Sequence, residues 1–96
     1  MIGPSKMDLK LIPDLSDRGY FKPYKNQIRL RKGMPKSMEA EVLLHEVLHA
    51  IHDTFNCHRI VPEGKEEGLV EAYSTALCTV FAQNPWLLKK LAKDLK

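Results

Sequence analysis

The chain has 96 residues, of which 44% are hydrophobic and 28% are charged, and its formal net charge is +3. This length predicts one small domain with a limited hydrophobic core. A bound metal would add to the stability of such a domain. The basic residues are scattered, and no stretch approaches the roughly 18 apolar residues that cross a bilayer, so we expect neither a nucleic-acid nor a membrane partner.

The two cysteines and the N-terminal residues bear on the cellular compartment. Cys57 and Cys78 form no C-x-x-C pair and no disulfide framework. The first ten residues lack the apolar region and the cleavage site of a signal peptide. We therefore expect a cytoplasmic protein with reduced thiols. The sequence leaves the oligomeric state open between a monomer and a weak dimer.

The first third of the chain alternates turn-forming residues with short strands. Residues 7–12 carry apolar side chains at every second position, which predicts a strand. Residues 19–24 and 27–31 flank Lys25 and Asn26, which suggests a hairpin. Together these segments predict a short N-terminal antiparallel β-sheet.

The second arm of this hairpin has two distinct faces. Ile28 and Leu30 are expected to point inward, while Gln27, Arg29 and Arg31 are expected to face water.

Three helices are predicted after the strands. The first covers residues 38–54 with Ser37 as its N-cap, and the second covers residues 65–82. Asn84 and Pro85 would begin a third, short amphipathic helix. One face of the second helix is expected to build the core; it consists of Leu69, Val70, Tyr73, Ala76, Leu77 and Val80. Strands followed by helices indicate the α+β class, here in a single domain spanning residues 1–96.

The strongest chemical signal is the H-E-x-x-H motif at residues 45–49, within the first predicted helix. His45 and His49 are four residues apart and lie on one helix face, so both imidazoles can bind one ion. Zinc favours such nitrogen ligands in a tetrahedral site with one open position. Glu46 cannot comfortably join them as a ligand, but it can take the proton of a metal-bound water.

A catalytic zinc site needs a third protein ligand. The metzincin arrangement is excluded, because Phe55 occupies the position of its third histidine. A carboxylate of the second helix would instead complete a His₂Glu set, and the candidates are Glu63, Glu66, Glu67 and Glu71. We favour Glu71, because it shares a face with the small residues Ser74, Thr75 and Cys78, which would let the two helices approach closely. Glu67, one turn earlier, is the alternative, and Glu63 and Glu66 are expected to be solvated.

Three segments together resemble a known family. They are residues 45–51 (HEVLHAI), 69–77 (LVEAYSTAL) and 83–88 (QNPWLL), and they resemble small phage- and prophage-type proteins of the ImmA/IrrE-like group of gluzincin metallopeptidases. The archaeal minigluzincins have a similar minimal plan, and the resemblance implies a minimal zincin-like fold in which a short sheet precedes the active-site helix. The resemblance covers about residues 20–90. It implies that His45, His49 and Glu71 bind zinc, that Glu46 is the general base, and that an edge strand receives an extended peptide.

We therefore expect a zinc-dependent metallopeptidase that acts on a peptide or protein substrate. His58, Tyr73 and Tyr24 are the candidates for stabilising the transition state, and each also has an ordinary structural or surface interpretation. His52 is expected to have a supporting or solvent-facing role rather than to bind the metal. The alternative function is a zinc-binding regulatory or interaction module of phage origin with little or no catalytic activity.

Overall fold

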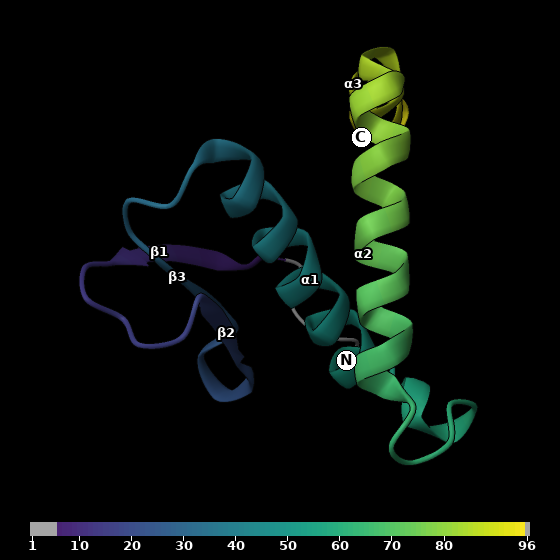
Figure 1. Ribbon diagram of the computed structural model, residues 1–96. Helices are drawn as coiled ribbons and strands as arrows, with labels where there is room; N and C mark the ends of the chain where they lie inside the picture. Colours follow the sequence, from purple (N-terminus) through teal and green to yellow (C-terminus); the bar gives the residue numbers. More distant parts are fainter. Residues whose placement is uncertain (1–5, 96) are drawn as a thin grey trace.

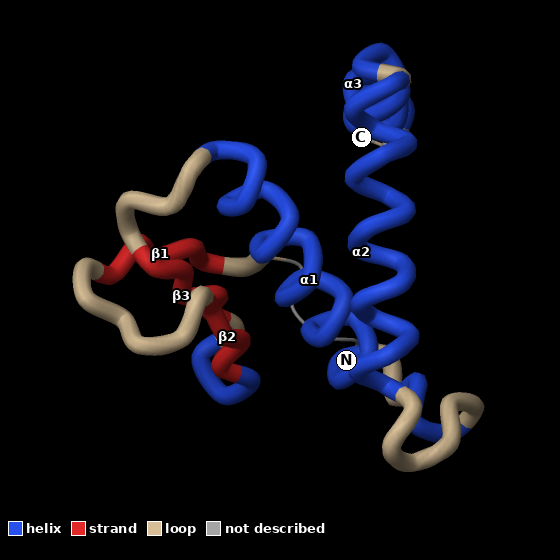
Figure 2. Tube along the Cα trace, in the orientation of Figure 1, coloured by secondary structure: helices blue, strands red, loops and turns tan. Residues whose placement is uncertain are grey.

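The computed structural model describes residues 6–95. Three strands, β1 (Asp8–Ile12), β2 (Gly19–Lys22) and β3 (Gln27–Arg31), precede three α-helices, α1 (Lys36–Thr54), α2 (Glu66–Gln83) and α3 (Pro85–Asp94). Two short 3-10 helices, η1 (Pro23–Lys25) and η2 (Cys57–Arg59), lie in the connections. The sheet packs on one side of α1, and α2 stands on the other side of it (Figures 1 and 2). The α+β prediction is confirmed.

The sheet has the strand order β1-β3-β2 and is mixed rather than purely antiparallel. The predicted hairpin is present, because β2 pairs antiparallel with β3. β1 pairs parallel with β3, which differs from the antiparallel sheet that we predicted. The chain reverses direction between β1 and β2 and again between β2 and β3, so β3 returns beside β1 in the same direction. Asn26, with a left-handed φ of 50°, closes the hairpin turn.

The core lies between the sheet and α1. Ile28 and Leu30 are 2% and 0% exposed and point toward α1, as predicted. The partly buried side chains packed around them are Phe21, Met38, Val42, Leu43 and Val47. Gln27, expected to face water, is buried instead. Its side-chain oxygen accepts a hydrogen bond of 2.7 Å from Arg29 Nε, which satisfies the buried amide.

The helix starts lie close to the predicted positions, but the capping differs at α1 and at α3. α1 begins at Lys36, and its N-cap position is Pro35 rather than Ser37. The Pro35 carbonyl accepts a hydrogen bond from the Glu39 backbone N–H, so the first turn closes earlier than predicted. α3 begins at Pro85, as predicted, but the Asn84 side chain donates to the Val80 carbonyl at the end of α2 instead of capping α3.

The part of α2 that packs against α1 includes both the apolar Val70 and the small residue Ser74. Ser74 and Val70 are 2% and 3% exposed at this contact. The apolar face predicted to build the core is largely exposed: Leu69 is 37%, Tyr73 58% and Val80 40% accessible. These three residues do not join the core, because α1 stands between α2 and the sheet (Figure 2), whereas Val70 of the same predicted face is buried as expected.

Among residues 6–95, none of the helices combines the length and the apolar character that a membrane span requires.

Candidate metal centre

The two histidines of the motif meet on the side of α1 that faces α2. His45 and His49 are four residues apart in the middle of a regular helix, and this spacing stacks their side chains on one face. Their Nε2 atoms are 3.2 Å apart, and their side chains are 22% and 21% exposed. Both nitrogens therefore point to the same partly open position, as two ligands of one ion must.

The carboxylate that reaches this position belongs to Glu67. Its oxygens lie 2.8 Å from His45 Nε2 and 3.1 Å from His49 Nε2. His45, His49 and Glu67 form the only group of metal-binding side chains of this kind found among residues 6–95. Ligand atoms of a tetrahedral zinc ion, each about 2.0–2.1 Å from the metal, lie about 3.3 Å from one another. The observed separations are close to that value, so the donor atoms fit a zinc ion.

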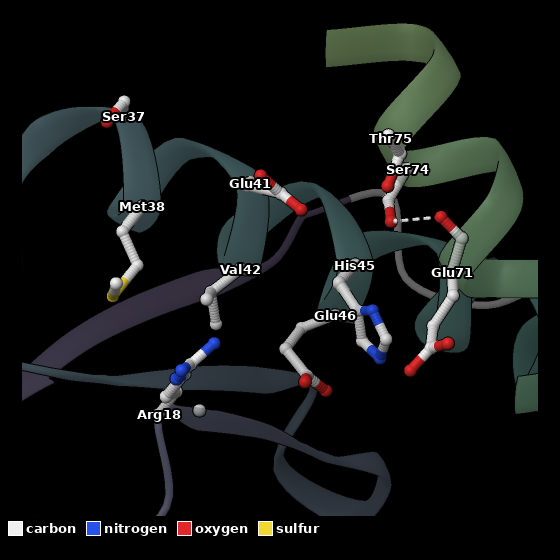
Figure 3. A pocket seen from close by; sticks show the side chains of 11 residues that line it. Arg18, Ser37, Met38, Glu41, Val42, His45, Glu46, Glu71, Ser74 and Thr75 are labelled. Carbon is white, nitrogen blue, oxygen red and sulfur yellow. Dashed lines mark hydrogen bonds between the residues drawn. The ribbon is translucent and has the colours of Figure 1, made fainter.

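Glu71, the ligand favoured from the sequence, is placed differently. It lies one helical turn after Glu67, which moves its Cα about 6 Å along α2. Glu71 lines a cleft together with His45, and Figure 3 shows its carboxylate pointing toward the His45 imidazole. The structure thus brings both carboxylates near the histidines, but only Glu67 belongs to the convergent group.

A second carboxylate supports the histidines from behind. Glu66 Oε2 is 2.7 Å from His49 Nδ1, the ring nitrogen opposite the one that faces Glu67. Glu66 Oε1 is 3.3 Å from Nδ1 of His52. We expected Glu66 to be solvated, but its side chain is only 41% exposed because the start of α2 lies against the end of α1.

Glu46, the residue of the motif expected to act as general base, is buried beside His45. Its residue is 9% exposed, and it lines the same cleft as His45. Burial raises the pKa of the Glu46 carboxyl; the nearby His49 and His45 lower it, and the Glu67 carboxylate raises it further. A raised pKa brings a carboxylate closer to the range in which it can both accept and return a proton at neutral pH.

The cleft beside Glu46 has a volume of about 640 Å³. It lies between the first half of α1, the middle of α2 and the start of β2 (Figure 3). Its lining residues are Arg18, Gly19, Ser37, Met38, Glu41, Val42, His45, Glu46, Glu71, Ser74 and Thr75. Gly19 is required there, since a Cβ atom would come within 2.7 Å of Leu30 Cδ2 and 3.0 Å of Val42 Cγ1. This close approach brings the edge strand β2 directly over α1.

None of the three predicted transition-state stabilisers lines this cleft. Tyr24 is fully exposed, and Tyr73 is 58% exposed on the outer face of α2. His58 lines a separate cavity of about 390 Å³ near His52. The cleft contains Arg18 instead, whose backbone carbonyl accepts a hydrogen bond of 2.8 Å from the Arg31 N–H. An isolated arginine before a predicted strand carries no sequence signal, so only the packing of Gly19 against α1 reveals it.

The chain was compared with protein-family models, curated proteins and solved structures, and no match was found in any of the three.

Proposed function

We propose that this protein is a zinc-dependent metallopeptidase of the gluzincin type. The observation that supports it best is the convergence of His45, His49 and Glu67 beside the buried Glu46, at the edge of a cleft. A site that only stabilised the fold would commonly be closed by four protein ligands. Here three ligands converge next to a carboxyl group suited to proton transfer, which favours hydrolysis.

Zinc agrees best with the chemistry of the donors. Two imidazole nitrogens and one carboxylate oxygen are the His₂Glu set of catalytic zinc sites, whereas calcium and magnesium prefer oxygen ligands alone. When bound, zinc would polarise a carbonyl group and lower the pKa of water to about 7. We propose His45, His49 and Glu67 as its ligands, with Glu71 as the alternative third ligand.

Residues that line the cleft would carry out the remaining chemistry. Glu46 would accept the proton of the attacking water and return it to the leaving amine. Arg18 would donate hydrogen bonds to the carbonyl oxygen or to a neighbouring group of the substrate, because it is the only lysine or arginine lining the described cleft. Glu71 and Glu41 would hold polar or cationic parts of the substrate.

A peptide is the substrate class that suits the cleft. β2 is an edge strand, since it pairs with β3 on one side only, and its first residue lines the cleft. An extended peptide could therefore add to the sheet through main-chain hydrogen bonds and pass over Glu46. This arrangement agrees with the resemblance to the ImmA/IrrE-like group, and we propose cytoplasmic, phage-related peptide hydrolysis on that basis.

The proposal is tested by metal content and by turnover of a degenerate peptide library. We expect one zinc per chain in the purified protein, and cleavage by wild type but not by Glu46→Gln, which should keep its metal. Glu39→Gln is the matched control, because it removes the same charge from α1 outside the cleft. Cleavage that survives in Glu46→Gln would refute the mechanism.

A zinc-binding interaction module remains the second candidate, and one observation favours it. The outer faces of α2 and α3 expose large apolar side chains, among them Tyr73, Trp86 and Leu88 at 58%, 60% and 52%. Exposed apolar surface of this kind commonly marks a protein-binding site. Stoichiometric zinc without any cleavage by wild type would favour this candidate.

A further inference from the structure

A carboxylate bridge connects two imidazoles of α1 at the start of α2. Glu66 is the first residue of α2, and its two oxygens approach two different histidines. Oε2 lies 2.7 Å from His49 Nδ1, and Oε1 lies 3.3 Å from His52 Nδ1. The histidines are three residues apart on α1, so one carboxylate can span both of them. No other carboxylate among residues 6–95 contacts two Nδ1 atoms in this way.

The shorter contact determines which nitrogen of His49 carries a proton. An ionised carboxylate only accepts hydrogen bonds, and both ring nitrogens of His49 face one. The contact of Nδ1 with Glu66 is 2.7 Å and that of Nε2 with Glu67 is 3.1 Å, so the shorter contact assigns the single proton of a neutral ring to Nδ1. In a neutral imidazole the lone pair is then on Nε2, which is the nitrogen that faces His45 and Glu67. The bridge thus leaves Nε2 free to bind a metal ion and fixes the plane of the ring.

We infer that Glu66 is a positioning residue that holds His49 in its metal-binding tautomer, and that His52 anchors Glu66. This inference rests on the proposed metal site and concerns how that site is prepared. Carboxylates that hydrogen-bond the outer nitrogen of a histidine ligand orient the ring and raise its basicity. Glu66 itself is not a ligand, because it approaches the ring nitrogen that points away from the converging donors.

The burial of His52 explains why Glu66 keeps this orientation. The His52 side chain is 8% exposed, compared with 41% for Glu66, so the imidazole that contacts Glu66 is held in packed surroundings. His52 Nε2 is buried without a partner among the described residues. Nδ1 is therefore the ring nitrogen of His52 that has a partner among these residues, and that partner is Glu66. This assigns a role to a histidine that the H-E-x-x-H motif does not include.

The experiment compares zinc affinity in wild type, Glu66→Ala and Glu63→Ala. Alanine at the first position of α2 is compatible with the helix, so Glu66→Ala should retain its fold, which circular dichroism checks. Glu63→Ala removes the same side chain three residues earlier, in the exposed loop, and is the control. Competition with a chromophoric chelator gives the Kd for zinc. The histidine tautomers are read from ¹⁵N chemical shifts of the metal-free protein.

We expect Glu66→Ala to bind one zinc with a Kd raised about 10- to 100-fold, and Glu63→Ala to match wild type. In metal-free wild type, His49 should carry its proton on Nδ1, whereas Glu66→Ala should show a mixture of tautomers. An unchanged Kd in Glu66→Ala, or a His49 proton on Nε2 in wild type, would overturn the inference. Absence of zinc binding in wild type would refute the proposed metal site, and the tautomer measurement would still decide whether the bridge exists.

Discussion

Replacing Glu67 by alanine should separate the two possible third ligands through thermal stability. A metal ion held by His45, His49 and Glu67 would join α1 to the first turn of α2. That junction matters here, because the core is small. Among residues 6–95, the buried hydrophobic residues are Ile28, Leu30, Met34, Ala50 and Val70. Binding to the folded state alone stabilises it by about 2.7 kcal/mol when free metal is 100-fold above Kd. For a domain of this size, that free energy corresponds to a Tm increase of about 10–20 °C.

The assay is thermal unfolding with and without zinc at fixed free-metal concentration. Wild type and Glu71→Ala should show the full increase in Tm, and Glu67→Ala should lose most of it. The two variants are matched, since each removes one glutamate side chain from the same helix, one turn apart. If Glu71→Ala loses the zinc-dependent increase while Glu67→Ala keeps it, the ligand assignment drawn from the Glu67 distances is wrong and Glu71 is the third ligand.

Three further predictions concern the cleft and its surroundings. Arg18→Gln should lower kcat/KM for the peptide library without changing the Kd for zinc. A kcat/KM equal to that of wild type would show that Arg18 takes no part in substrate binding. Gly19→Ala should lower the free energy of unfolding by about 1–3 kcal/mol in urea denaturation, because its Cβ would come within 2.7 Å of Leu30 Cδ2; an unchanged midpoint would contradict the close packing of β2. Burial, with a smaller contribution from Glu41, raises the pKa of the Cys78 thiol. Only the thiolate reacts, so the rate of Cys78 alkylation by iodoacetamide should have its midpoint at a higher pH than the rate for an unstructured cysteine peptide. Glu41→Gln should lower this midpoint pH. A midpoint at or below that of the peptide would contradict the burial of Cys78.

Much of the fold was predictable from local patterns. The inward positions Ile28 and Leu30, the start of α3 at Pro85 and the helical context of the H-E-x-x-H motif all depend on neighbours within a few residues. Side-chain alternation and helix-terminus preferences act over this range, so they are readable without knowing the tertiary structure. The same reasoning could not show that β1 runs parallel to β3, because strand pairing depends on how the intervening chain reverses.

The H-E-x-x-H motif alone placed the two proposed metal ligands, His45 and His49, beside the proposed general base, Glu46. The spacing of His45, Glu46 and His49 on one helix sets which side chains share a face. This inference needs only the geometry of a single helix. Tertiary structure decided the rest of the site. Whether Glu67 or Glu71 reaches the histidines depends on where α2 crosses α1, and a difference of one turn moves a carboxylate by about 6 Å. The bridge from Glu66 likewise requires two helices in contact, since its partner His49 is 17 residues away in the chain.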